Sequence, residues 1–193
     1  LASALGIGRI AALVGSSVGG FQAVEWAVEE PARFDRLVLI ATAAKASPWT
    51  IAVDETQRMA IEADATFGQP RDDAGMKGLA AARAIGLLTY RGSSGYNLTQ
   101  QDRVEWPAEH RASTYQQYQG EKLCRRYNAY SYYTILDAFD THDVGRGRGG
   151  VAAALARIEA RTLVVGITTD IIFTPGEMRE LHGMIPGSRY REI

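Results

Sequence analysis

Apolar runs and amphipathic segments alternate at both ends of the chain. The runs Ile10–Val14, Leu37–Ala41 and Thr162–Ile167 are short and almost wholly apolar, which is typical of buried strands. Between the first two lies Phe21–Glu30, whose apolar residues suit a largely buried helix that ends before Pro31. A strand, a helix and a second strand in this order predict a βαβ unit and therefore a parallel sheet.

The middle of the chain has a different character. Strand-like runs disappear, and helical segments rich in Tyr, Arg and Gln replace them, at Glu55–Ala63, Met76–Tyr90 and Tyr115–Phe139. A long helical insertion between the strands of a sheet usually forms a cap or lid. The sheet pattern then resumes, with helices at Val151–Glu159 and Pro175–Met184 and a last strand from about Arg189. We therefore expect an α/β core at 1–45 and 151–193 and a helical lid at 46–150.

Both ends of the chain resemble cut ends. The chain begins at Leu1, no signal-peptide pattern follows, and the alternating segment Ser188–Ile193 stops without a turn. We therefore expect a piece of a longer protein whose sheet is truncated at both ends.

Composition excludes several function classes. The formal net charge is −1 and the pI about 6.4, which gives no electrostatic argument for nucleic acid or an anionic membrane as partner. No apolar run approaches the roughly 18 residues of a membrane span. Cys124 is the single cysteine, so an intramolecular disulfide is impossible, which is compatible with the cytoplasm.

The segment Gly15–Gly20 carries the strongest chemical signal. It has the G-x-S-x-G pattern between a predicted strand and a predicted helix, which is the setting of a nucleophile elbow. Ser17 has glycines two positions before and after it, where larger residues are expected to clash, whereas Ser16 has valines there. Ser17 is thus the predicted nucleophile, and the Val18 N–H supplies half of an oxyanion hole. The alternative is a phosphate-binding loop, but the Lys of a Walker loop and the G-x-G-x-x-G of a Rossmann turn are both missing.

Asp170 is the candidate acid of a catalytic triad. It follows the strand Thr162–Ile167 at the edge of the sheet that carries the site in open parallel sheets. The alternative is an aspartate that only caps a turn. His110 and His142 precede Asp170, and His182 lies inside a predicted helix. We assign all three histidines to structure or surface, and we expect the catalytic base outside this chain.

Several segments resemble the homoserine O-acetyltransferase family, over essentially the whole chain. The elbow Ser17–Ala27 is similar to the family's elbow, and Leu163–Asp170 to its strand and acid. Further similar segments are Ile40–Ala44, Trp49–Ala52, Glu55–Arg58, Ala81–Tyr90, Asn128–Tyr130 and Asp143–Gly150. The sequence departs from the family at Ser16, Val18 and Thr174; the first two bear on the preference for the acyl donor.

The resemblance implies an α/β-hydrolase fold with a helical lid and an acetyl transfer from acetyl-CoA to L-homoserine, a cytoplasmic step towards methionine. Ser17 is then the nucleophile and Asp170 the acid. Arg83 binds the substrate carboxylate and Tyr90 lines the site, whereas the alternatives are a surface arginine and a packing tyrosine. Arg58 is the second candidate for the carboxylate. The resemblance also implies a homodimer formed through the lid, with neither a cofactor nor a metal.

Three other functions remain open. The same mechanism serves a succinyl-CoA donor or a serine acceptor. A plain esterase would have a small or open lid, and a non-catalytic binding protein of the same fold would not need an intact elbow. Because the base and half of the oxyanion hole are expected elsewhere, the 193-residue chain by itself is predicted to be inactive.

Overall fold

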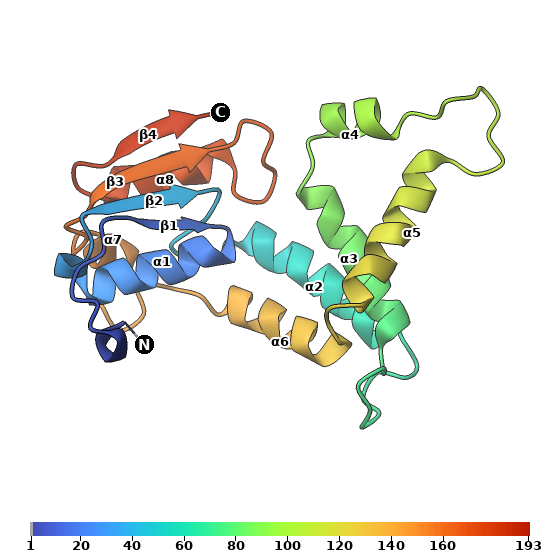
Figure 1. Cartoon of the computed structure of the whole chain (residues 1–193), viewed down its shortest axis with the longest axis horizontal. Coiled ribbons are helices and arrows are strands. Elements are labelled where there is room, and N and C mark those ends of the chain that lie inside the picture. Colours follow the sequence, from blue (N-terminus) through green and yellow to red (C-terminus); the bar gives the residue numbers. More distant parts are fainter. Residues whose placement is uncertain (1) are drawn as a thin grey trace. The chain divides into compact units, whose positions relative to one another are not determined.

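The computed structural model describes residues 2–193 and divides into two compact units. The first unit comprises the chain up to Ala46 together with His142–Ile193, and the second comprises Ser47–Thr141. Figure 1 shows the first as a sheet with helices and the second as helices alone. Each unit is described by itself below.

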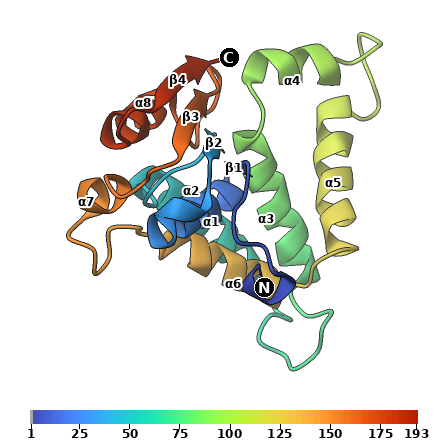
Figure 2. The same cartoon turned by 60° about the vertical axis from the view of Figure 1, so that its left-hand side comes forward.

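The first unit is built on a parallel sheet in the order β1-β2-β3-β4. Its strands are β1 (Leu13–Ser16), β2 (Arg36–Ile40), β3 (Arg161–Gly166) and β4 (Arg189–Glu192). Helix α1 (Val18–Glu29) joins β1 to β2, and α8 (Pro175–Met184) joins β3 to β4. Because the strand order runs in one direction, right-handed crossovers place both helices on the same face of the sheet (Figures 1 and 2).

Burial alternates along the strands as this arrangement requires. The row of side chains on the helix-covered face includes Leu39 and Val164, which are fully buried. The row on the other face includes Val14, which is 61% exposed, and Val38 and Leu163, which are half-buried. The expectation of fully buried strands is therefore wrong for this face, because the helices among the described residues of this unit cover the opposite one.

The first unit also contains short helices. Helix α7 (Val151–Leu155) precedes β3 and packs against α1, and 3-10 turns lie at Ser3–Leu5 and Pro31–Arg33. Helix α8 begins at a capping box in which the Thr174 hydroxyl accepts from the Glu177 N–H and the Glu177 carboxylate accepts from the Thr174 N–H. Thr174, one of the departures from the family pattern, thus defines where this helix begins.

The second unit is a bundle of five helices among the residues described. They are α2 (Pro48–Glu62), α3 (Met76–Thr89), α4 (Ser93–Gln100), α5 (Arg111–Cys124) and α6 (Ala129–Asp140). Helix α3 packs against α2, α5 and α6, and a small core forms around Ile61, Leu79, Ala82 and Ala129. Ser47 caps α2 by accepting from the Thr50 N–H, and Asn128 caps α6 by accepting from the Ser131 N–H.

Candidate active site

The turn between β1 and α1 has an unusual backbone. Ser17 adopts φ 50° and ψ −127°, and Ala41, just after β2, adopts φ 44°. They are the only non-glycine residues with positive φ in the described chain. Such conformations cost about 1–3 kcal/mol each and persist only where the surroundings enforce them. The backbone of Ser17 is therefore strained in the manner expected of a nucleophile elbow.

The end of β2 holds this strained turn in place. The Ser17 N–H donates to the carbonyls of Ala41 at 2.9 Å and Ile40 at 3.2 Å. The Ser17 carbonyl accepts from the Thr42 hydroxyl at 2.7 Å and from the Gly20 N–H at 2.9 Å. Thr42 is fully buried. The Thr42 contact links positions that are 25 residues apart, and nothing in the sequence pattern of Thr42 predicts it.

The glycines of the elbow differ in how much space a side chain would have at each position. A Cβ at Gly15 would collide with the Gly19 carbonyl and would lie 2.8 Å from the Ala23 Cβ, as the sequence predicts. A Cβ at Gly19 would meet no atom of the described chain within 4 Å, so the predicted clash at this position is wrong. The close approach occurs one residue later, because a Cβ at Gly20 would overlap the Thr42 side chain.

This difference gives a stability prediction. Gly20→Ala is expected to lower the free energy of unfolding by about 1–3 kcal/mol, because the added methyl overpacks against buried Thr42. Gly19→Ala is the matched control: it lies in the same helical turn with open space, and it should be neutral or gain up to about 1 kcal/mol from helix propensity. Urea unfolding of both variants measures the difference. Equal stabilities would contradict the packing seen at Gly20.

The two serines of the elbow lie in different surroundings. Ser16 is the last residue of β1 and pairs with Ile40. Ser17 is the N-cap residue of α1, but its hydroxyl accepts no capping hydrogen bond from the helix. The N–H groups of Val18 and Gly19 open α1 and precede the first N–H that bonds back to the Ser17 carbonyl, that of Gly20. The geometry thus favours Ser17 as the nucleophile, and the oxyanion role of Val18 stays a prediction.

Asp170 lies at the same edge of the sheet as Ser17. It comes four residues after the end of β3, in a turn where its Oδ1 accepts from the N–H groups of Ile172 at 2.8 Å and Phe173 at 3.0 Å. This bonding fixes the half-buried carboxylate and also fits the alternative of a turn cap. Since β2 separates β1 from β3, their ends lie two strand spacings apart, about 10 Å. A triad here needs a bridging imidazole.

Two of the three histidines form side-chain contacts away from the elbow. His182, near the end of α8, contacts the Ser188 hydroxyl at 2.7 Å, just before β4 begins. It therefore lies at the edge of the sheet opposite Ser17. His110, in the second unit, contacts Asp102 at 2.7 Å.

His142 is used in packing. Its ring stacks on Phe21 with a centroid distance of 4.2 Å, and burial lowers its pKa. That none of the three histidines is the base stays a prediction.

The second unit contains both arginines considered for a substrate carboxylate. Arg58 is buried and pairs with Asp140 at 2.6 Å and with Glu55 at 2.8 Å. Arg83, in α3, lies over the Tyr90 ring at 5.2 Å from its centroid. In residues 2–193 it forms no salt bridge, so its charge is available to a ligand where that of Arg58 is already neutralised.

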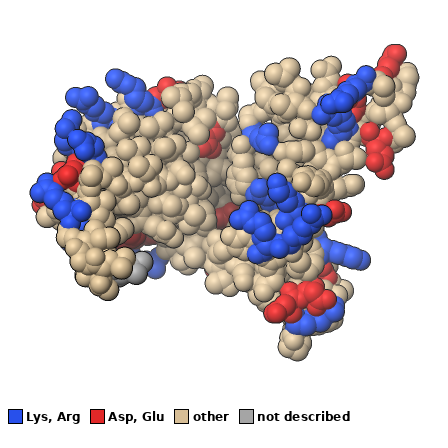
Figure 3. Space-filling view, viewed as in Figure 1, with Lys and Arg blue, Asp and Glu red and all other residues tan. Residues whose placement is uncertain are grey.

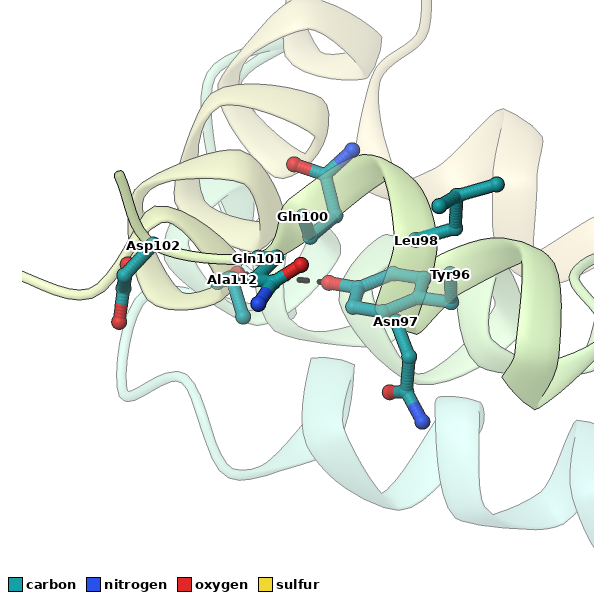
Figure 4. Close-up of a pocket in the computed structure, with 7 residues that line it drawn as sticks. All are labelled: Tyr96, Asn97, Leu98, Gln100, Gln101, Asp102 and Ala112. Atoms are coloured by element: carbon teal, nitrogen blue, oxygen red, sulfur yellow. Dashed lines mark hydrogen bonds between the residues drawn. The ribbon is translucent and has the colours of Figure 1, made fainter. Parts of the chain in front are cut away.

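A surface pocket also occurs in the second unit. It has a volume of about 580 Å³ and lies where α4 meets the start of α5 (Figure 4). The Tyr96 hydroxyl donates across it to the Ala112 carbonyl at 3.4 Å, and Asp102 is already bonded to His110 and to the Arg111 N–H. None of the predicted site residues lines it; the lining residues are Tyr96, Asn97, Leu98, Gln100, Gln101, Asp102 and Ala112.

The described residues form neither a metal-binding cluster nor a membrane-spanning helix. No group of three or more His, Cys, Asp or Glu side chains within residues 2–193 could hold a metal ion. None of the described helices is both long enough and apolar enough to cross a membrane. Lys and Arg occur together with Asp and Glu on both units in the face drawn in Figure 3.

The comparisons with known proteins agree with this geometry. The family model of the alpha/beta hydrolase fold matches residues 2–73, which include the elbow. A homoserine O-acetyltransferase from Cyclobacterium marinum is 44% identical over 98% of the chain and 54% of its own length. One from Thermus thermophilus is 42% identical over 95% of the chain and 46% of its own length.

Solved structures of related names superpose on this chain over nearly its whole length. A homoserine O-acetyltransferase from Staphylococcus aureus superposes with a TM-score of 0.80 at 30% identity, over 99% of this chain and 53% of that one. An acetylester hydrolase from Corynebacterium glutamicum superposes with a TM-score of 0.87 at 25% identity, over 100% of this chain and 56% of that one.

The parallel sheet with a strained serine at the start of α1 is an α/β-hydrolase fold, as the sequence predicts. Within this fold, the chain is a relative of the homoserine O-acetyltransferases. It spans about half the length of the curated relatives that it matches.

Proposed function

We propose that the protein transfers an acetyl group from acetyl-CoA to the hydroxyl of L-homoserine. The observation that supports this most directly is the strained elbow at Ser17, in a chain whose relatives carry the name of this activity.

The mechanism proceeds through an acyl-enzyme. The Ser17 oxygen attacks the thioester carbonyl and gives its proton to a histidine base that Asp170 orients. The Val18 N–H stabilises the oxyanion, the C–S bond breaks, and CoA leaves as the thiol with that proton. The homoserine hydroxyl then attacks the acetyl-serine and gives its proton to the same base. The bond between the acetyl carbon and the Ser17 oxygen breaks, the base returns the proton to that oxygen, and O-acetylhomoserine leaves. None of His110, His142 and His182 is proposed as this base.

Arg83 and Tyr90 supply the contact to the acceptor. A guanidinium with no carboxylate partner in the described chain suits the carboxylate of an amino acid, because two parallel N–H groups can bind its two oxygens. Neither a metal nor a cofactor takes part in these steps. The acyl groups move between CoA, Ser17 and the acceptor alone.

A second candidate function is acetyl-ester hydrolysis, which the superposition on the acetylester hydrolase favours. The complete gene product is incubated with acetyl-CoA, with or without L-homoserine, and thiol release and O-acetylhomoserine are measured. Acceptor-dependent thiol release supports the transferase. Rapid hydrolysis of acetyl esters that homoserine does not alter would establish the hydrolase. Succinyl-CoA and L-serine, tested in the same assay, decide between the related donors and acceptors.

We also propose that the protein is a homodimer whose protomers meet through the second unit. Its proposed location is the cytoplasm. It exposes large apolar side chains at Trp106 (87%), Leu98 (80%) and Val104 (63%). Exposed residues of this kind commonly mark contacts with another protein chain. Sedimentation equilibrium of the complete gene product is expected to give twice the monomer mass. A monomer at micromolar concentration would contradict this part of the proposal.

A further inference from the structure

A chain of hydrogen-bonded polar groups runs through the second unit beneath α3. The Tyr132 hydroxyl, from α6, donates to the Gln57 Oε1 at 2.7 Å. The Gln57 Nε2, from α2, donates to the Asp54 Oδ1 at 2.9 Å. Gln57 is only 2% exposed, so both ends of its amide are committed to these partners. The amide therefore has one fixed orientation.

Helix α3 lies directly against this amide. Its residues Arg83, Gly86 and Tyr90 share one helical face, being three and four positions apart. A Cβ at Gly86 would lie 2.6 Å from the Gln57 Oε1 and 3.4 Å from the Tyr90 hydroxyl oxygen. Gly86 thus marks the point where α2 comes so close that Gln57 and Tyr90 converge. Arg83 lies one turn earlier on the same face, over the Tyr90 ring.

Ionisable side chains surround this cluster, and most of them are paired with one another. Arg58 is buried and pairs with Asp140, which in turn lies beside Asp54. Burial and the Asp140 charge raise the pKa of Asp54 to about 7, so Asp54 is only about half ionised near Gln57 at neutral pH. Burial and the neighbouring Tyr90 raise the pKa of Tyr132 above its usual range, so this phenol remains a proton donor. Arg83, beside this cluster, forms no salt bridge with a carboxylate among residues 2–193.

We propose that Tyr132 and Gln57 are positioning residues that hold Tyr90, and through it Arg83, ready for the carboxylate of the acceptor. This inference rests on the proposed function. Tyr132 fixes the Gln57 amide, and Gln57 fills the space beneath Gly86 against which Tyr90 rests. Without the Tyr132 hydroxyl the amide can rotate and the support of Tyr90 is lost. The guanidinium stacked on Tyr90 then samples other rotamers, which weakens carboxylate binding.

The acceptor step alone should respond to this change. Acylation of Ser17 involves no carboxylate of an amino acid, whereas transfer to homoserine does. Tyr132→Phe removes one hydroxyl and keeps the ring. Tyr133→Phe is the matched control, because Tyr133 is the neighbouring tyrosine of the same helix and donates to Glu62 at 2.6 Å, outside the cluster.

The experiment measures how the acetyl-enzyme of the complete gene product partitions between L-homoserine and water. This ratio does not depend on the fraction of folded enzyme, so a less stable variant still gives a result. We expect Tyr132→Phe to raise the homoserine concentration needed for half-maximal transfer about 10-fold, with the rate of acetyl-enzyme formation within about 2-fold of the parent. Tyr133→Phe should match the parent in both.

Two results would overturn the inference. One is an unchanged partition in Tyr132→Phe, and the other is an equal change in Tyr133→Phe, which indicates a general effect of α6. A failure of the proposed function looks different: the unsubstituted protein would then form no acetyl-enzyme, or would partition to water at every homoserine concentration. Gln57→Met is the second variant, and it should reproduce the effect of Tyr132→Phe because it removes the accepting carbonyl at similar volume.

Discussion

Ser17→Ala is expected to abolish acetyl-enzyme formation, with a loss of turnover on the order of 10⁴- to 10⁶-fold. The reason is chemical, since the variant lacks the hydroxyl oxygen to which the acetyl group is proposed to bond. Incubation of the complete gene product with acetyl-CoA, followed by intact-mass measurement, checks the result. The acetyl adduct should be present in the parent protein and missing from the variant.

Ser16→Ala is the control for this experiment. Ser16 is the adjacent serine, but it ends β1 with regular pairing to Ile40, whereas Ser17 has positive φ and an uncommitted hydroxyl at the start of α1. Ser16→Ala should therefore keep most of the acetyl-enzyme. An adduct that survives Ser17→Ala, or one that disappears only with Ser16→Ala, would show that the nucleophile has been misplaced.

The elbow was predictable because its signal is local. The spacing of Gly15 and Gly19 around Ser17 and the switch from strand to helix are visible within a few residues. The reason given for Gly19 was nevertheless wrong, because the close contact involves Gly20 and the distant Thr42. Contacts between residues far apart in the sequence, such as the support of Ser17 by Ala41 and Thr42, leave no pattern in a single sequence.

The helices of the second unit show the same limit. The pattern predicts one helix over Tyr115–Phe139, but the structure has α5 and α6, which are separated by a break after Cys124. The signal for this break was present in Asn128, which caps α6. Helix α4 was not predicted, since Ser93–Gln100 is short, buries no residue and is rich in Ser, Gly, Asn and Thr, which are weak helix formers.

Strand boundaries shifted for a related reason. The run Ile10–Val14 predicts a strand that begins three residues before β1 does, and Ile10 forms only an isolated bridge with Phe34. Pairing partners decide where a strand starts, and an apolar run cannot reveal them. The parallel direction, by contrast, follows from the βαβ pattern, and the structure confirms it.

Substitution of Arg83 should separate the two half-reactions. Arg83→Ala is expected to leave the acylation of Ser17 nearly unchanged and to lower kcat/KM for homoserine about 10- to 150-fold, equivalent to roughly 1.5–3 kcal/mol for a lost charged hydrogen bond. Arg83→Lys keeps the charge but loses the two-pronged geometry, so its loss should be smaller. Hydrolysis of the acetyl-enzyme should persist, because water needs no carboxylate anchor. Single-turnover measurements of each half-reaction provide the test.

Arg91→Ala is the matched control, because Arg91 stacks over Tyr115 at 5.5 Å much as Arg83 stacks over Tyr90 at 5.2 Å. Both variants lose a guanidinium and one cation–π contact in the same unit, so a general cost to the bundle should appear in both. Only Arg83 is proposed to meet the acceptor. Equal losses in the two half-reactions of Arg83→Ala, or a comparable loss in Arg91→Ala, would assign Arg83 to the packing of the bundle. Arg58 could not then take its place without first giving up its bond to Asp140, because that guanidinium is buried and already neutralised.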